Sequence, residues 1–340
     1  MEFGNVPIYV TSFFGLFTTI YFTLTLLHNR KEWWMGDNLE CKPVTICVPC
    51  FNEGETVVKT LKSLSNLDYD KDKLEIIVVD DGSSDDTYYR AKEFADNNKH
   101  IDIKIYQKEN GGKYTALNYA LARCRGEFFG ALDADSYVHE KALKRIVKYF
   151  DNPDVTAVTP AMMIGEPKSF LQKIQAVEFY LGVLLRKVFA LMGSIHVTPG
   201  PFSMFRKSFF DKYGGYKKGH LTEDIELSLR IQDKGGIIEN ALDGYVYTLG
   251  ENTWTSLKKQ RTRWYFGFLK NMMDYKHLFG ARQGNLGLFI LPISIISVVL
   301  LITSISYAIF SLFREAITDI SNLAAINFDL SEMSLFNWDL

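Results

Sequence analysis

Two long stretches without charged residues restrict this chain more than any other feature of its sequence. Val6–Leu27 carries no charged side chain and is long enough to cross a bilayer core of about 30 Å. A second uncharged run, Gly284–Phe313, lies between Arg282 and Arg314. Its length exceeds the minimum for spanning, which allows a tilted helix or an interfacial turn at Pro292. The sequence therefore predicts a membrane protein.

The residues that flank these runs predict how the chain is oriented. No lysine or arginine precedes the first run and no cleavage site of small residues follows it, which argues against a cleaved signal peptide. Arg30 and Lys31 follow the first run, and Lys270 and Lys276 precede the second. By the positive-inside rule we expect a multi-pass protein of the cell membrane with residues 28–283 in the cytoplasm. The expected division is a transmembrane helix at 1–30, a soluble domain at 40–250, an amphipathic interface helix at 251–283, a transmembrane segment at 284–313 and a C-terminal tail at 314–340.

The region between the two runs alternates between strand and helix patterns. Val44–Val48 and Leu74–Asp80 are continuous β-branched runs, typical of strands covered on both faces. Apolar residues at helical spacing separate them, and similar units follow. Further strands are expected at 101–106, 128–132 and 155–160, with helices between them. The pattern predicts an α/β domain with a mostly parallel sheet and helices on both of its faces.

Polar or glycine-bearing segments follow four of these predicted strands, at 49–55, 80–86, 109–113 and 133–136. Because ligands bind at the carboxyl ends of strands in such sheets, the four segments predict one site. The spacings G-x-G-x-x-G and G-x-x-x-x-G-K-[ST] are absent, which excludes the two common nucleotide fingerprints. Asp133 and Asp135 are best interpreted as carboxylate ligands for Mg²⁺ or Mn²⁺ beneath a diphosphate.

Charge and cysteine content argue against two other classes of function. Lys and Arg number 38 against 40 Asp and Glu, so the chain lacks the basic excess of a nucleic-acid-binding protein. Cys47 and Cys50 form a C-x-x-C spacing, but no second pair or paired histidine accompanies it. A structural role is therefore favoured over a redox or zinc site.

Seven motifs in order resemble glycosyltransferase family 2, over roughly residues 43–267. They are CVPCFNEGE, VVDDGSSDDT, NGGKYTALN, ALDADS, VTPGPFSMFR, LTEDIELSLRI and QRTRW. The TED and Q-x-x-R-W motifs are similar to those of the membrane-embedded processive branch, which includes cellulose, hyaluronan, chitin and poly-N-acetylglucosamine synthases. The resemblance implies a GT-A fold and a nucleotide-diphosphate sugar, with UDP as the expected nucleotide.

The resemblance also assigns roles to individual residues. Asp224 would be the general base of an inverting transfer, with Glu223 beside it in the catalytic motif. Asp133 and Asp135 would hold the metal, which assists departure of the diphosphate. The residues expected to bind the nucleotide are Phe51, Asn52, Glu53, Asp81, Lys113 and Asp133, and those expected at the acceptor and pyrophosphate are Gln260, Arg263 and Trp264.

Simpler interpretations of two of these motifs remain open. Glu223 and Asp224 begin an apolar-periodic stretch, where acidic residues favour a helix N-terminus. Residues 254–275, like residues 170–192, have the pattern of an amphipathic helix at a membrane surface. Both interpretations are compatible with the catalytic ones.

Three functions remain open on the sequence alone. The leading one is a metal-dependent membrane transferase that extends a polysaccharide. The alternatives are a lipid-linked or glycan-priming transferase, and a catalytically inactive nucleotide-sugar receptor. Only one long apolar segment follows the Q-x-x-R-W motif, whereas processive enzymes carry more. A truncated chain, a channel made by oligomerisation or by an additional subunit, or an enzyme that adds few sugars would each account for this departure.

Overall fold

The computed structural model describes residues 6–30 and 40–325 and divides them into two compact units. One unit combines the chain up to Leu24 with the chain from Leu291 onward, and the other extends from Thr25 to Ile290. Lys31, one of the basic residues used for the orientation, lies outside the described residues. So do residues 326–340 of the expected tail.

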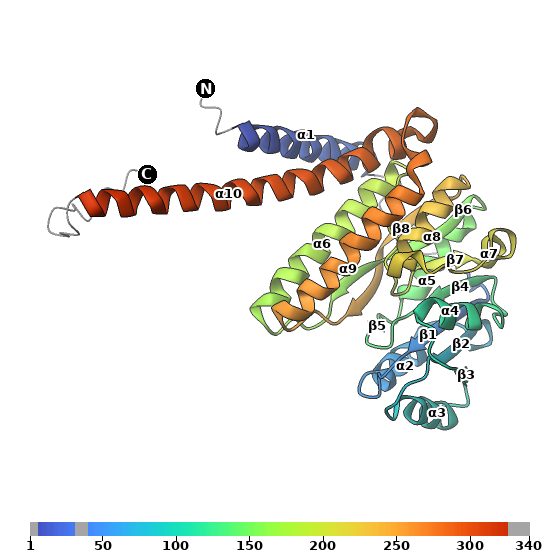
Figure 1. Cartoon of the computed structure of the whole chain (residues 1–340). Helices are drawn as coiled ribbons and strands as arrows, with labels where there is room; N and C mark the ends of the chain where they lie inside the picture. The colour runs from blue at the N-terminus through green and yellow to red at the C-terminus, as the bar shows by residue number, and fades with distance from the viewer. Residues whose placement is uncertain (1–5, 31–39, 326–340) are drawn as a thin grey trace. The chain divides into compact units, whose positions relative to one another are not determined.

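The larger unit is built on one eight-stranded sheet with the order β3-β2-β1-β4-β7-β6-β8-β5 (Figure 1). The pairs β1–β2, β2–β3, β1–β4 and β6–β8 are parallel, whereas β7 runs antiparallel to both of its neighbours and β5 runs antiparallel to β8. The sheet is therefore mixed, and the expected parallel arrangement holds for its first four strands. The strands are β1 (Val44–Cys50), β2 (Leu74–Asp80), β3 (Asp102–Gln107), β4 (Phe128–Ala131), β5 (Tyr137–Val138), β6 (Val155–Ile164), β7 (Met204–Arg206) and β8 (Ile237–Thr248).

Helices cover both faces of the sheet, as the continuous apolar strands predict. Successive residues of a strand point to opposite faces. On β2, Ile76 and Val78 therefore pack into one hydrophobic cluster, and Ile77 and Val79 pack into the other. The helices of this unit are α2 (Val57–Ser65), α3 (Thr87–Asn97), α4 (Lys113–Leu121), α5 (Ala142–Val147), α6 (Phe170–Leu191), α7 (Lys207–Tyr213), α8 (Glu223–Asp233) and α9 (Trp254–Asp274).

The long helices α6 and α9 lie side by side (Figure 1). Arg261 on α9 forms an ion pair of 2.7 Å with Glu178 on α6. Both helices expose large apolar side chains, among them Val177 and Tyr180 on α6 and Phe266 and Met273 on α9. This exposure agrees with the amphipathic pattern expected for both stretches.

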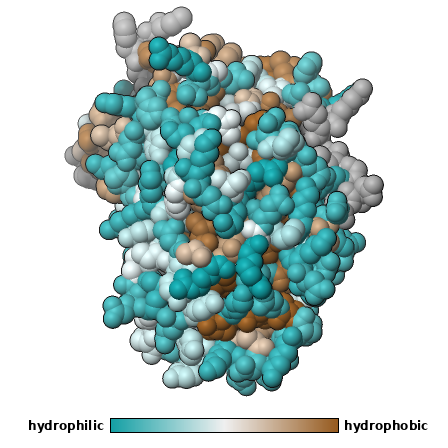
Figure 2. Space-filling model, turned by 90° about the vertical axis from the view of Figure 1, so that its right-hand side faces the viewer, coloured by the Kyte–Doolittle hydropathy of each residue, from teal (hydrophilic) through white to brown (hydrophobic). Residues whose placement is uncertain are grey.

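The face of the molecule at the right-hand side of Figure 1, where α7 lies, is different in character. Hydrophilic residues cover most of it, and hydrophobic residues show between them in smaller patches (Figure 2). Such a surface is normal for a water-exposed domain, because scattered apolar atoms remain on every protein surface.

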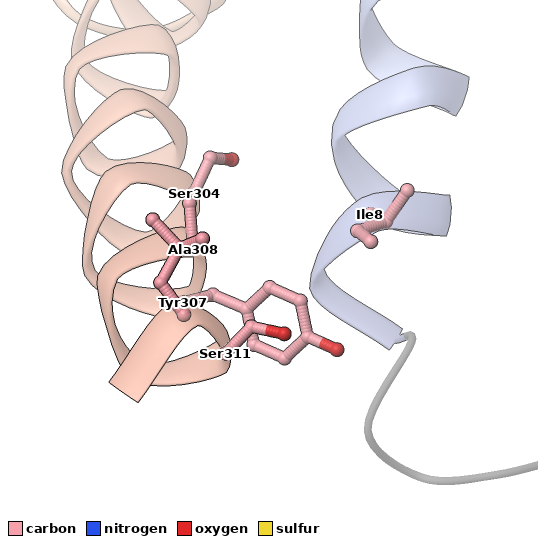
Figure 3. A pocket seen from close by; sticks show the side chains of 6 residues that line it. Ile8, Ser304, Tyr307, Ala308 and Ser311 are labelled. Carbon is pink, nitrogen blue, oxygen red and sulfur yellow. The ribbon is translucent and has the colours of Figure 1, made fainter. Parts of the chain in front are cut away.

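The smaller unit contains α1 (Val6–His28) and α10 (Leu291–Ala325), two helices that are long and apolar enough to cross a membrane. Thr11 on α1 and Ser304 on α10 are joined by a hydroxyl–hydroxyl hydrogen bond of 3.0 Å. Ile8 of α1 and Ser304, Tyr307 and Ser311 of α10 line a pocket of about 410 Å³ between these helices (Figure 3).

Helix α10 differs from the segment expected at 284–313. A π-helical turn, Leu286–Ile290, precedes it, and the helix continues past Arg314 to Ala325. Pro292 is the second residue of α10 and not the site of a separate turn. The backbone from residue 284 to 291 is already helical, so Pro292 lies inside a longer helical stretch, directly after the π-helical turn.

Candidate active site

The loop after β1 is hydrogen-bonded to the loop after β2, as expected for loops at one sheet edge. Asn52 has a left-handed backbone (φ 57°), which asparagine tolerates better than most residues. Its N–H donates to Ser83 Oγ (2.8 Å), and its Oδ1 accepts from the N–H of Ser84 (2.9 Å). Phe51, next to it, is half exposed, and Glu53 accepts a hydrogen bond from Thr56 Oγ1. Phe51 and Glu53, which are predicted to contact a nucleoside, thus lie directly after the carboxyl end of β1.

Asp81 anchors the glycine segment that follows β3. Its side chain is almost fully buried, and it accepts hydrogen bonds from Lys108 Nζ (2.6 Å) and from the N–H of Gly112 (2.8 Å). Gly112 has a φ of 88°, a conformation that glycine adopts without strain. The Asp81 carboxylate therefore fixes the backbone immediately before Lys113, where α4 begins.

Lys113 connects the two groups of carboxylates predicted from the sequence. Its Nζ lies 2.5 Å from Asp133 Oδ1, at the end of β4, and 3.6 Å from Glu223 Oε1, at the start of α8. Burial alone would lower the pKa of Lys113, but the charges of Asp133 and Glu223 raise it above its ordinary value. The lysine is therefore a fixed cation between the expected metal ligands and the expected base.

Asp135 carries an unfavourable negative charge in this arrangement. Burial, and then the charge of Asp133, raise its pKa to about 6. Ser136 Oγ donates a hydrogen bond of 2.9 Å to Asp135 Oδ1, which only partly offsets these effects. A divalent cation would favour the ionised form, because opposite charge at close range stabilises a carboxylate.

The donor set at Asp133 and Asp135 fits a hard cation. Carboxylate oxygens are the ligands that Mg²⁺ and Mn²⁺ prefer. Within residues 6–30 and 40–325 there is no group of three or more His, Cys, Asp or Glu side chains that could hold a metal ion. Two protein carboxylates completed by substrate phosphates and water are the usual arrangement for Mg²⁺.

Asp224 sits in the first turn of α8 with its backbone firmly held. Thr198 Oγ1 donates to its carbonyl oxygen (3.0 Å), and Ser228 Oγ donates to the same atom (3.1 Å). Its Oδ1 accepts from the N–H of Ile225. Burial, and then the charge of Glu223, raise the pKa of Asp224 to about 7. A carboxylate with this pKa is suited to accept a proton near neutral pH.

A small pocket brings these groups together. It is lined by residues of six separate segments, among them Lys113, Thr198, Gly200, Tyr216, Glu223 and Asp224. Thr198 and Gly200 belong to the VTPG stretch noted in the sequence, but Tyr216 was not predicted as a site residue. The sequence gives no periodic signal at Tyr216, because it lies in the loop after α7.

The backbone before Asp224 is strained. Gly219, His220 and Leu221 are all left-handed, with φ values of 53°, 53° and 72°. For a residue other than glycine this conformation costs about 1–2 kcal/mol. Side chains of α9 contact this turn, and Arg263 Nη1 donates to the Leu221 carbonyl (3.3 Å).

The three residues of the Q-x-x-R-W motif have different surroundings. Only Arg263 reaches the turn before Asp224, and its charge also lowers the pKa of Asp224, in opposition to the burial that raises it. Gln260 donates to Glu251 Oε1 (2.9 Å), and the Trp264 ring lies 4.2 Å from the guanidinium of Arg261. The structure thus brings Arg263 toward the pocket, whereas the contacts given for Gln260 and Trp264 are with Glu251 and Arg261.

The C-x-x-C pair lies within β1. Cys47 and Cys50 are both buried and free of disulfides. Burial raises the pKa of both thiols, so both stay protonated at neutral pH. The structural interpretation of this pair fits these surroundings.

Comparison with known proteins gives the family of this chain. Residues 45–214 match the family model for glycosyl transferase family 2, and the chain belongs to this family. Its predicted resemblance to the polysaccharide synthases of the family is confirmed.

Two curated relatives illustrate that resemblance. The poly-beta-1,6-N-acetyl-D-glucosamine synthase of Staphylococcus aureus (strain COL) is 31% identical over 274 residues, which cover 78% of this chain and 65% of the relative. The synthase of the same name from Staphylococcus epidermidis is 30% identical over 266 residues, covering 74% of this chain and 63% of the relative. The chain thus spans slightly less than two thirds of the length of these relatives.

A solved structure shares the fold. The mannosyltransferase PcManGT from Pyrobaculum calidifontis, determined in complex with GDP-Man and Mn²⁺, aligns with a TM-score of 0.65 at 21% identity. The alignment covers 81% of this chain and 76% of that one. At this identity the likeness concerns the fold, and it confirms the GT-A architecture expected from the sequence.

Proposed function

We propose that this chain moves a hexose or N-acetylhexosamine from a nucleotide-diphosphate sugar, with UDP as the nucleotide, to a hydroxyl group of a growing polysaccharide. The names of the relatives from the two Staphylococcus species favour N-acetylglucosamine as the sugar. The observation that carries the proposal is the position of Lys113, which holds Asp133 on one side and Glu223, beside Asp224, on the other.

The chemistry proposed for this site is a single displacement that inverts the anomeric carbon. The acceptor oxygen forms a bond to that carbon while the bond from carbon to the diphosphate oxygen breaks. Asp224 accepts the proton of the acceptor hydroxyl, and the diphosphate leaves with the electron pair. The pKa of about 7 supports this role for Asp224. Lys113 and Arg263 would both face the negative charge of the diphosphate, which is the pyrophosphate group of the donor.

A divalent cation held by Asp133 and Asp135 would stabilise the charge that develops on the departing diphosphate. Phe51 and Glu53 would contact the nucleoside, with Asp81 fixing the neighbouring glycine loop. Gln260 and Trp264 would act on the acceptor side. The chemical type of each of these side chains suits the role assigned to it.

We further propose that α1 and α10 both cross the cell membrane and that the unit from Thr25 to Ile290 lies in the cytoplasm. The positive-inside distribution of Arg30, Lys270 and Lys276 supports this orientation. The acceptor would then be a glycan or a lipid-linked glycan near the bilayer. A further subunit or a second copy of the chain would complete a channel for a long polymer.

The test is release of the nucleotide by the purified full chain. The protein is incubated with Mn²⁺ or Mg²⁺ and a panel of UDP- and GDP-sugars, and free nucleotide and product are measured. We expect UDP release and an extended glycan. A sugar attached only to lipid would favour the lipid-linked transferase, and nucleotide binding without any release would support the receptor.

A further inference from the structure

One face of α9 contacts the segment that leads into Asp224. Arg263, Gly267, Asn271 and Tyr275 follow each other at four-residue intervals, which places them along one side of a helix. Tyr275 is the residue that caps its C-terminal end. Only the first of these residues belongs to the Q-x-x-R-W motif.

Gly267 and Asn271 pack directly against the TED motif. A Cβ atom at Gly267 would lie 2.2 Å from Thr222 Oγ1, so only glycine allows α9 to approach this closely. The amide nitrogen of Asn271 lies 2.9 Å from the carbonyl oxygen of Gly219 and 2.9 Å from Thr222 Oγ1. Asn271 is 1% exposed. A buried amide in this position fixes both ends of the turn from Gly219 to Thr222.

The C-terminal end of the same face is hydrogen-bonded to α8. The hydroxyl of Tyr275 donates a hydrogen bond of 2.7 Å to Glu226 Oε1. The other oxygen of Glu226 accepts from Arg230 Nη2 (3.1 Å). The Nη1 of the same guanidinium donates to the carbonyl oxygens of Tyr213 and Gly214. Helix α8 is thereby joined to α9 on one side and to the loop after α7 on the other.

The turn from Gly219 to Leu221 needs such support. Three successive left-handed residues are unfavourable when two of them carry side chains, and such backbones persist where neighbouring groups fix them. In addition to the Asn271 contact, His220 Nε2 lies 2.8 Å from Asp274 Oδ2 at the end of α9. The contacts from α9 are thus concentrated on the most strained part of the site.

We propose that Asn271 and Tyr275 are positioning residues for the transfer: the α9 face holds the Gly219–Glu226 segment in its strained form and so sets the direction of the Asp224 carboxylate. This inference rests on the proposed function of Asp224 as the base. Neither residue touches the substrate in this account. Loss of either contact lets the turn relax, which moves Asp224 relative to the acceptor and leaves the donor site at Lys113 and Asp133 unchanged.

The experiment compares Asn271→Ala with the parent in the full-length protein. Donor affinity is measured as UDP binding, and turnover as UDP release at saturating donor. We expect turnover to fall about tenfold to a hundredfold, since small displacements of catalytic groups have effects of this size. The dissociation constant for UDP should stay within about twofold. A role in stability alone would reduce the fraction of active protein and leave turnover per binding-competent molecule unchanged.

The dependence of the transfer rate on pH is a second, independent test of the proposal. The groups that face Asp224 are Glu223 on its own helix, Lys113 on α4 and Arg263 on α9. A relaxed turn admits water, which weakens the burial that raises the pKa of Asp224. In Asn271→Ala the acidic limb of the profile should therefore move to lower pH.

Two further variants keep the test decisive. Tyr275→Phe removes one hydroxyl group and little volume, so it decides the matter if Asn271→Ala does not fold. Asn97→Ala is a matched control, because Asn97 is exposed at the end of α3 and should match the parent. Parental turnover and an unshifted pH profile in Asn271→Ala and Tyr275→Phe would overturn the proposal. A parent that transfers no sugar would instead overturn the proposed function.

Discussion

Lys113 Nζ lies 2.5 Å from Asp133 Oδ1. The same nitrogen lies 3.6 Å from Glu223, so one cation lies between the proposed metal ligands and the residue next to the proposed base. The lysine charge offsets part of the repulsion among the four carboxylates Asp133, Asp135, Glu223 and Asp224. This arrangement also predicts what happens when the cation is removed.

Lys113→Met should weaken nucleotide binding about tenfold to a hundredfold, because hydrogen bonds to charged groups typically contribute 1.5–3 kcal/mol. The measurement is calorimetric titration with UDP in the presence of Mn²⁺. Lys259→Met, an exposed position on α9, is the matched control. Equal UDP affinity in Lys113→Met and the parent would show that the lysine does not face the diphosphate.

Activity should require a divalent cation, and Asp135→Asn should abolish the response to it while the protein stays folded. The side chain of asparagine keeps one oxygen but not the negative charge that a metal needs. The measurement is UDP release against Mn²⁺ concentration, with circular dichroism as the check on folding. Undiminished turnover in excess EDTA would contradict the metal role of Asp133 and Asp135.

The rate should depend on pH through the base. Burial, and then the charge of Glu223, raise the pKa of Asp224 to about 7, and a base works only in its ionised form. At saturating metal, kcat/KM should therefore rise with pH below about 7 and level off above it. A kcat/KM profile that is flat through this range would place the base elsewhere.

The topology can be tested by labelling a single introduced cysteine. Lys99 is exposed in the connection after α3, and Cys47 and Cys50 are buried. With Cys41→Ser and Cys124→Ser as the background, we expect an impermeant maleimide to label Lys99→Cys in inside-out vesicles and not in intact cells. Labelling in intact cells would reverse the proposed orientation.

Much of the sheet could be predicted because the early strands carry a strong local signal. The run Leu74–Asp80 is buried along its whole length, so the expected strand and β2 coincide. Strand β7 has only three residues, too few for any period to be visible, and it was not expected. Strand β8 contains Asp243 and Gly244 beside a register shift, and these residues interrupt the apolar pattern. The mixed character of the sheet comes from β7 and from the two-residue strand β5, which run opposite to the other strands.

The candidate site divides in the same way. The carboxylates and Lys113 were predicted because short motifs carry their chemistry. The left-handed backbone at Leu221 had no local signal, and that at His220 had only a weak one, since histidine adopts a positive φ more often than most residues do. Asn271 did carry a local signal: it lies eight residues after Arg263 and therefore on the same face of a helix. This signal was not used to predict a site residue.

The central claim is that Asp224 is the base, and Asp224→Asn tests it most directly. Asparagine keeps the shape and a hydrogen-bonding oxygen but does not accept the proton. A base contributes to the transition state and little to ground-state binding of the donor. On one preparation, UDP affinity should stay within a few-fold of the parent while transfer falls at least about a hundredfold. Transfer at the parental rate by folded, nucleotide-binding Asp224→Asn would contradict the account.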